Sequence, residues 1–190
     1  MAPLAPFLIS AALGCMVIGC SPTPKHLELV NVADGELKTQ KGICYWNGSV
    51  FSGSFYELNI KGDTIGIFSY RNGKEDDVWK QFYENHQLKA TRMFSRGKKT
   101  GEYKGWWENG KTKFIYHFEN NEYEGICQEW SPDGKLLREA NYESGHEAGP
   151  QKVWYSNGKI KSNYVVIDGR RYGLLGTKHC INVSDSVFNF

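Results

Sequence analysis

Few residues in this sequence have the types and spacing that catalysis requires. Three common catalytic motifs are absent from it: a Gly-x-Ser-x-Gly nucleophile elbow, a His-Glu-x-x-His zinc helix and a glycine-rich phosphate loop that opens a helix. Acidic residues are plentiful, but Glu108, Glu129 and Glu143 fall at unrelated positions of the chain's repeating pattern, so no acid and base are paired. We therefore expect no catalytic residue, no enzymatic activity and no cofactor.

The cysteines and histidines do not form a metal-binding pattern. Beyond Cys20 the cysteines are Cys44, Cys127 and Cys180, an odd number that permits at most one disulfide and lacks the spacing of a metal or redox motif. His179 adjoins Cys180, but a metal site would need further ligands from elsewhere. The sequence predicts no metal site and a packing role for Cys127.

Cys20 is the one residue whose surroundings indicate a covalent modification. The stretch APLAPFLISAALGCMVIGC is apolar and uncharged and is followed by the polar SPTPKH, as in a secretory leader near its cleavage point. The run VIGC resembles a bacterial lipobox, which implies cleavage before Cys20 and a lipid on that cysteine. Basic residues are missing near the start, so a plain signal peptide and an uncleaved anchor stay open as alternatives. Ser21 resembles the second residue of lipoproteins sent to the outer membrane, so we expect a lipid-anchored protein of the bacterial cell envelope.

The rest of the chain repeats every 24 residues, a period typical of repeat architectures. Four columns recur in one frame, and units begin near 53, 77, 101, 125 and 149. The first turn column is Asn85, Asn109, Asp133 and Asn157; the aromatic column is Phe82, Trp106, Trp130 and Trp154. The other two columns are Tyr70, Phe94, Phe118, Tyr142, Val166 and Gly73, Gly97, Asn121, Gly145, Gly169.

Each unit has the pattern of a β-hairpin. An Asn-Gly or Asp-Gly pair between two apolar runs predicts a two-residue primed turn, which needs positive φ at both central residues. In 112–119, residues of alternating type place aromatics on one face and mixed residues on the other. We expect an all-β protein in which repeated 24-residue hairpins form one elongated antiparallel meander.

The aromatic column next to the first turn is the candidate binding surface. We expect Phe82, Trp106, Trp130 and Trp154 to form a ladder across the sheet, since cross-strand aromatic pairs stabilise sheets. A second set of aromatics follows them and is expected on the reverse face: Tyr83, Trp107 and Tyr155. Packing within a curved sheet is an equally good explanation of both sets.

The units resemble a known repeat family. The segments GWWENGKTKFIYHFENNEYEG and KVWYSNGKIKSNYVVIDGRRYG are similar to variant MORN repeats, in particular to the YwqK-like group, over about residues 53–172. The resemblance implies a β-hairpin array used for binding or scaffolding, in some relatives at membranes. Members are often labelled antitoxins, which implies the alternative function of neutralising a partner toxin. Two residues depart from the family pattern: His86 stands where the other units have the turn glycine, and Pro132 follows two residues after Trp130.

Charge excludes one class of partner. The formal net charge is +2, without the strongly basic region of a dedicated nucleic-acid binder. Lys80, Lys104 and Lys152 share a column, which we interpret as a solvated strand face, with binding to the anionic headgroups of a lipid surface as the alternative. The expected partners are therefore an envelope protein, peptide or glycan, together with the membrane through the lipid anchor.

The sequence divides into four segments. Residues 1–19 are the expected signal peptide, 20–41 a lipid-anchored tether, 42–172 the hairpin array with a degenerate first hairpin at 42–52, and 173–190 a C-terminal cap or tail.

The lipidation of Cys20 is directly testable. We expect mass spectrometry of the mature N-terminus to find a lipidated Cys20, globomycin to block processing, and Cys20→Ser to move the protein out of the membrane fraction. An unmodified N-terminus that begins with Met1 would contradict the prediction.

Overall fold

The computed structural model describes residues 28–176, and this part of the chain is built almost entirely of β-strands. Its one helical element there is a 3-10 turn, η1 (Val32–Asp34). No helix in residues 28–176 has the length and apolar character needed to cross a membrane. The first strands are β1 (Glu28–Asn31), β2 (Leu37–Gln40), β3 (Ile43–Trp46) and β4 (Ser49–Val50). The repeat strands are β5 (Gly53–Leu58), β6 (Thr64–Arg71), β7 (Lys74–Glu75), β8 (Asp77–Phe82), β9 (Leu88–Ser95), β10 (Lys98–Trp106), β11 (Thr112–Glu119), β12 (Glu122–Tyr123), β13 (Gly125–Trp130), β14 (Leu136–Glu143), β15 (His146–Trp154), β16 (Ile160–Ile167) and β17 (Arg170–Leu174).

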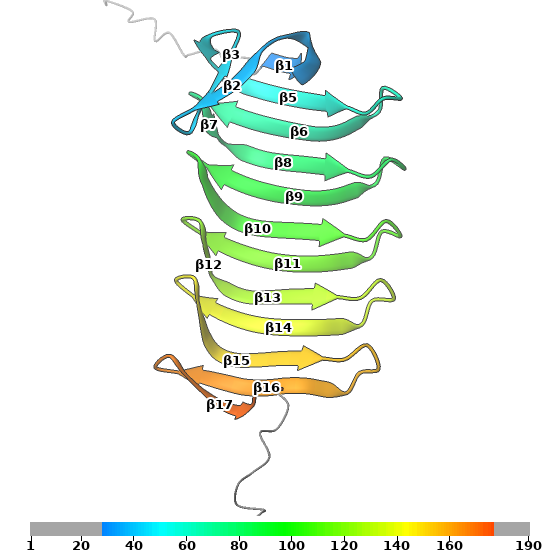
Figure 1. The fold of residues 1–190 in the computed structure, drawn as a ribbon, viewed down its shortest axis with the longest axis vertical. Coiled ribbons are helices and arrows are strands. Elements are labelled where there is room, and N and C mark those ends of the chain that lie inside the picture. Colours follow the sequence, from blue (N-terminus) through cyan, green and yellow to red (C-terminus); the bar gives the residue numbers. More distant parts are fainter. Residues whose placement is uncertain (1–27, 177–190) are drawn as a thin grey trace, which may run out of the picture.

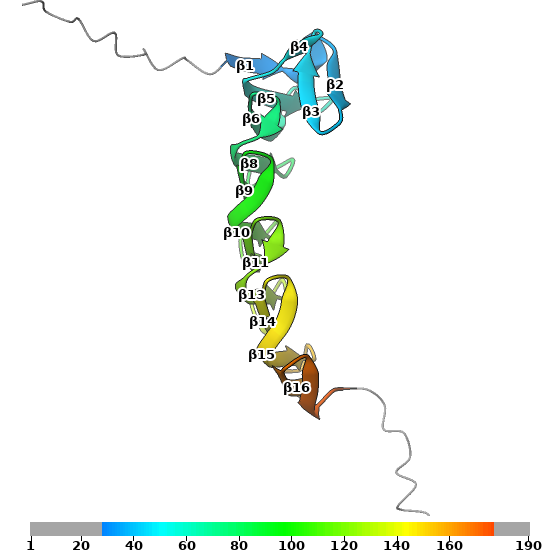
Figure 2. The same cartoon turned by 90° about the vertical axis from the view of Figure 1, so that its left-hand side faces the viewer.

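The strands form one long ribbon, as the 24-residue period predicts. A 14-stranded sheet runs in the order β1-β5-β6-β8-β9-β10-β11-β13-β14-β15-β16-β17, with β7 and β12 pairing at its margin. Successive hairpins lie side by side along the long axis (Figure 1), and the ribbon is one sheet thick below its first hairpin (Figure 2). All its pairings are antiparallel except that of β1 with β5. The expected all-β hairpin meander is confirmed.

The hairpin loops at the Asn-Gly column differ from the predicted turn. In the loop after β10, the Trp107 amide donates to the Lys111 carbonyl and the Gly110 amide donates to the Trp107 carbonyl, both at 2.8 Å. Only Gly110 has positive φ (80°), whereas Asn109 does not. This is a three-residue loop with a type I turn and a glycine bulge. The Asn109 side chain accepts from the Lys111 amide at 3.1 Å, which explains the asparagine.

The primed turns lie at the opposite edge of the ribbon. There both central residues have positive φ, for example Arg96 (51°) with Gly97 (82°) and Ser144 (48°) with Gly145 (79°). These are two-residue type I′ turns, which match the twist of the flanking strands. The column of Gly73, Gly97, Asn121, Gly145 and Gly169 therefore marks the tightest turns.

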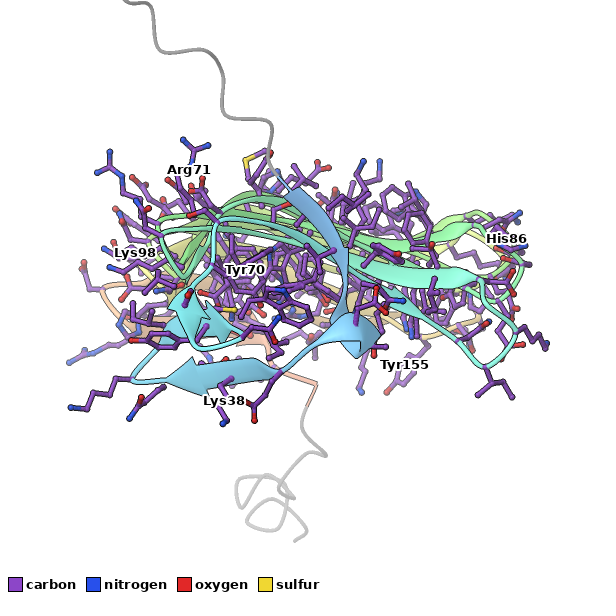
Figure 3. The ribbon with its side chains drawn as sticks, turned by 90° about the horizontal axis from the view of Figure 1, so that it is seen from above. Lys38, Tyr70, Arg71, His86, Lys98 and Tyr155 are labelled. Carbon is purple, nitrogen blue, oxygen red and sulfur yellow. The ribbon has the colours of Figure 1, made fainter. Side chains whose placement is uncertain are left out.

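The two faces of the sheet are distinct. Phe55, Phe68, Trp79, Arg92, Tyr103, Tyr116, Cys127, Ala140, Gln151 and Tyr164 follow one another across the sheet as opposed residues of neighbouring strands. We call this set the central row, and the face that carries it the inner face. Tyr70 points to the inner face, on the concave side of the arch where β2 and β3 lie, whereas Arg71 points to the other side (Figure 3).

A small second layer covers only the N-terminal end of the inner face. Strands β2, β3 and β4 form a separate three-stranded sheet there. Its Cys44 and Phe51 are buried together with Phe55 of the ribbon, and Trp46 and Tyr70 pack around them. The 42–52 hairpin is thus formed, but it is folded over the ribbon and is not a further unit of it. The described part of the expected tether, 28–41, contains β1 and β2, while Cys20 and residues 177–190 lie outside the described residues.

The altered turn at His86 should cost stability. His86 holds the left-handed position (φ 63°) that glycine fills in the equivalent loops, and such a conformation costs an L-residue about 1 kcal/mol or more. We expect His86→Gly to raise the free energy of unfolding by about 0.5 to 1 kcal/mol, and Gly110→Ala to lower it by about 1 to 2 kcal/mol, in urea titrations. A Cβ at Gly110 meets no atom closer than 3.9 Å, so a loss there measures backbone strain alone. Equal stability of both variants and the parent would contradict this account.

Candidate binding surface on the inner face

Aromatic rings cover the first half of the inner face in two clusters. In the first cluster the Trp79 ring lies 5.1 Å from Phe68, 5.4 Å from Tyr70 and 4.6 Å from Phe94 between centroids. The Trp79 indole also donates to the Ser69 carbonyl at 2.9 Å, which fixes the plane of the ring. The alternation of strand side chains places all these rings on one side of the sheet, so they form a rigid apolar wall.

The second cluster begins at Tyr103 on β10. Its ring lies 4.7 Å from Phe114, and Phe114 stacks on Tyr116 at 4.7 Å with an interplanar angle of 13°. Gly105 makes this arrangement possible, because a Cβ there would lie 2.4 Å from the Phe114 ring. The cluster continues through Phe118, Tyr123 and Tyr142.

Arg92 stands between the two clusters. On β9 it is opposed by Trp79 on one side and Tyr103 on the other. Its guanidinium carbon lies 3.9 Å from the centroid of the Tyr103 ring, a cation–π arrangement. The Arg92 Nε is buried and has no hydrogen-bond partner among the described residues.

The inner face becomes polar toward the C-terminal end. Arg138 there is satisfied by the chain itself: its guanidinium lies 3.1 Å from a Glu129 carboxylate oxygen and donates to the Tyr142 hydroxyl at 2.6 Å. Further along, Gln151 is buried and donates to the Asn141 carbonyl at 2.7 Å. Aromatic contacts are thus replaced by hydrogen bonds, so the face is not uniform along the ribbon.

Two adjoining depressions lie on the aromatic half. One of about 180 Å³ is lined by Phe68, Trp79, Gln81, Ala90, Arg92 and Tyr103. The other, of about 260 Å³, lies beneath the small N-terminal sheet and is lined by Val32, Leu37, Phe55, Glu57, Phe68, Tyr70 and Trp79. They share Phe68 and Trp79 and therefore adjoin, and we call the two depressions together the inner groove.

The aromatic column predicted as the binding surface does not line the inner groove. Phe82, Trp106, Trp130 and Trp154 are the last residues of β8, β10, β13 and β15, beside the first turn column, and all are half-buried. A register shift precedes each of them.

The expected ladder of these rings is wrong. No ring pair in the described part of the chain joins two of them, because successive members stand two strands apart, about 10 Å. The residues between them on the returning strands are aliphatic or small, for example Thr112 opposite Trp106 and Leu136 opposite Trp130. A continuous ladder needs a ring on every strand.

The second predicted set links neighbouring units. The Trp107 indole donates to the Trp130 carbonyl at 3.0 Å, and the Tyr83 hydroxyl donates to the Trp106 carbonyl at 2.8 Å. The Asn109 side-chain amide donates to the Pro132 carbonyl at 2.8 Å in the same way. Tyr155 is 50% exposed. These contacts support the packing explanation for Trp107 and Tyr83.

The cysteines of the described chain are structural. Cys44 and Cys127 are buried, unpaired thiols, and burial raises the pKa of each, which disfavours the nucleophilic thiolate. Cys127 lies opposite Ala140 in the central row, consistent with the predicted packing role. No group of three or more His, Cys, Asp or Glu side chains within residues 28–176 is placed to hold a metal ion.

Trp79, Arg92 and Tyr103 were missed as site residues by the sequence analysis. Trp79 and Tyr103 each stand two residues after the unit's first column, at Asp77 and Gly101, so strand alternation alone would place them on one face. Arg92 had no such signal, since its equivalent one unit later is Tyr116.

Comparisons with known proteins identify the repeat. Residues 99–120, 123–144 and 148–164 match the family model described as MORN repeat variant, so three of the 24-residue units are similar to this repeat. The hairpins β5–β6 and β8–β9 repeat the same arrangement upstream of the match.

Other comparisons add little. No curated protein matches the chain. The solved structures that resemble it include the crystal structure of TarM and that of a mutant of S. aureus TarM in complex with Fondaparinux, alpha-GlcNAc-glycerol and UDP. Each is 16% identical, the alignment covers 58% of this chain but 21% of TarM, and the TM-scores are 0.33 and 0.34. Likeness at this level supports no inference about function.

The link between units through Trp107 predicts a specific loss of stability. Trp107→Phe keeps a ring but removes the donor to the Trp130 carbonyl, and we expect it to lower the free energy of unfolding by about 1 kcal/mol. Tyr83→Phe should behave alike, and Tyr155→Phe at the half-exposed position serves as control. A control loss as large as that of Trp107→Phe would contradict the assignment.

Proposed function

We propose that this protein is a non-enzymatic cell-envelope lipoprotein whose MORN-variant ribbon binds a polypeptide segment along its inner face. The observation that carries the proposal is the inner groove together with the aromatic rings that extend it to Tyr142. In residues 28–176 only the small N-terminal sheet lies over this face (Figure 2).

The apolar surface supports a binding role. Contiguous aromatic surface left open to water on a folded chain normally marks an interaction site. Here the rings are held by ring contacts and, at Trp79, by a hydrogen bond, so little conformational entropy would be lost on binding. Tyrosine, tryptophan and arginine are also the residues that dominate binding energy at interfaces.

The shape of the groove favours an extended polypeptide as the ligand. The groove runs across the strands, along the axis of the ribbon, over several neighbouring hairpins. Its lining combines apolar rings with three hydrogen-bonding groups, namely Glu57, Gln81 and Arg92. A polypeptide offers both apolar side chains and backbone amides at matching spacing.

The proposed location in the cell envelope is inferred from the sequence. The run Val17–Cys20 supports a lipid at the mature N-terminus. A lipid there would hold the ribbon near a membrane surface without a spanning segment. The ribbon would then present its inner face to other molecules of the envelope.

Paired variants test the inner face as the binding surface. Peptides selected from a random displayed library on the immobilised mature chain would be measured by isothermal titration calorimetry. We expect Tyr103→Ala to weaken the selected peptides about tenfold or more, because it removes a ring from the groove. Lys104→Ala, the adjacent residue on the other face, should leave affinity unchanged.

The two variants distinguish binding on the inner face from binding on the opposite face. Thermal unfolding of both variants checks that the ribbon stays folded. Loss with Lys104→Ala and none with Tyr103→Ala would place the site on the opposite face, and a library that yields no binder would remove the support for a polypeptide ligand.

A further inference from the structure

We infer that Arg92 is a carboxylate-binding residue, and that the inner groove takes the free C-terminus of a polypeptide that ends in an apolar residue. The inference rests on the proposed function and specifies its ligand. It follows from the contrast between the two arginines at the centre of the inner face.

Arg138 and Arg92 are held in different ways. Arg138 faces Glu129 across the β13–β14 pair and meets both that carboxylate and the Tyr142 hydroxyl. Arg92 faces Trp79 and Tyr103, and none of the carboxylates of residues 28–176 forms an ion pair with it. The fold thus supplies an anion to one arginine and aromatic rings to the other.

The aromatic setting prepares Arg92 for an anionic ligand. The Tyr103 ring, with its centroid 3.9 Å from the guanidinium carbon, holds that group by its face and leaves the edge donors for an acceptor. The Nε is buried without a partner, and no hydrogen bond or ion pair of the described chain holds the guanidinium, so the chain itself supplies no acceptor to this group. A carboxylate is the acceptor whose geometry matches two parallel guanidinium donors.

The two depressions indicate which kind of ligand would carry the carboxylate that binds Arg92. Ala90 leaves space beside Arg92, where the equivalent residue of the next unit is Phe114, and this space is the depression of about 180 Å³. The adjoining depression of about 260 Å³ is lined mainly by apolar side chains, including Leu37 and Phe55. The last residue of a polypeptide carries a carboxylate beside its side chain, so it could place the carboxylate at Arg92 in the first depression and an apolar side chain toward the second.

Two polar groups favour a peptide over a fatty acid. Glu57 and Gln81 both flank Gly66 on the inner face; Gln81 lines the smaller depression and Glu57 the larger one. They offer an anionic acceptor and a side-chain amide to the backbone groups of an incoming peptide. A fatty acid has no amide to pair with them, so Glu57 would stand beside its alkyl chain unpaired.

The test uses short peptides with an apolar last residue and the mature chain. Fluorescence anisotropy would compare one labelled peptide ending in phenylalanine as the free acid and as the C-terminal amide. We expect the free acid to bind and the amide to bind about tenfold or more weakly, since amidation removes the charge that Arg92 meets. This comparison needs no variant and so does not depend on the folding of one.

Variants then assign the effect to Arg92. Arg92→Gln should reduce free-acid binding about tenfold or more and abolish the difference between acid and amide, whereas Arg138→Gln, the matched arginine with its own carboxylate, should keep that difference. Arg92→Lys should bind weakly, because an ammonium lacks the paired donors. Thermal unfolding of each variant accompanies the binding data.

Three results would overturn the inference. Equal binding of acid and amide by the parent chain would remove the carboxylate while leaving the inner face as a peptide site. Binding of dodecanoate with no binding of the peptide would replace the polypeptide by a lipid. Acid selectivity that survives Arg92→Gln would place the carboxylate on another residue.

Discussion

A sheet one layer thick must be stabilised without a conventional core, and this constraint governs the structure. Below the first hairpin no second layer buries the inner face within residues 28–176, so the apolar side chains must cover one another sideways. Rings that lean across neighbouring strands do this on the aromatic half, where Trp79 contacts three other rings. Hydrogen bonds between units at both edges supply the rest, through Trp107 at one edge and through Gly97 to the Glu75 carbonyl at the other. Each hairpin is therefore held by its two neighbours.

The sequence allowed the architecture to be predicted because turns repeat in register. Positive φ and tight turns restrict residue types strongly, so Gly110 and Gly145 mark their positions in any such chain. The type of turn could not be assigned in the same way. An Asn-Gly pair suits both a two-residue loop and a three-residue loop with a bulge, and the choice depends on the register of the strands on either side. The expected tryptophan ladder failed for a related reason, since a column shows which residues are equivalent but not what stands between them.

The binding surface was only partly predictable. Strand alternation predicts an aromatic face in 112–119, and the structure places Phe114 and Tyr116 there. The surroundings of Arg92 depend on three strands at once. Trp79 and Tyr103 lie on either side of it, and Ala90 leaves space nearby. A repeat column cannot reveal them, because the site exists only where one unit departs from its equivalents. In this chain the repeated positions build the sheet, and the candidate site lies where one unit departs from its equivalents.

The change along the inner face also has a mechanical consequence. Near the N-terminal end, interlocked rings and the small covering sheet tie several hairpins into one stiff block. Toward β17 contacts between rings give way to hydrogen bonds and an ion pair, and every residue of β17 is exposed. Bending and local opening of the backbone should then concentrate near β17, because each unit there is stabilised mainly by its contacts with the neighbouring unit. The N-terminal part of the described ribbon should therefore resist bending more than the part that leads to β17.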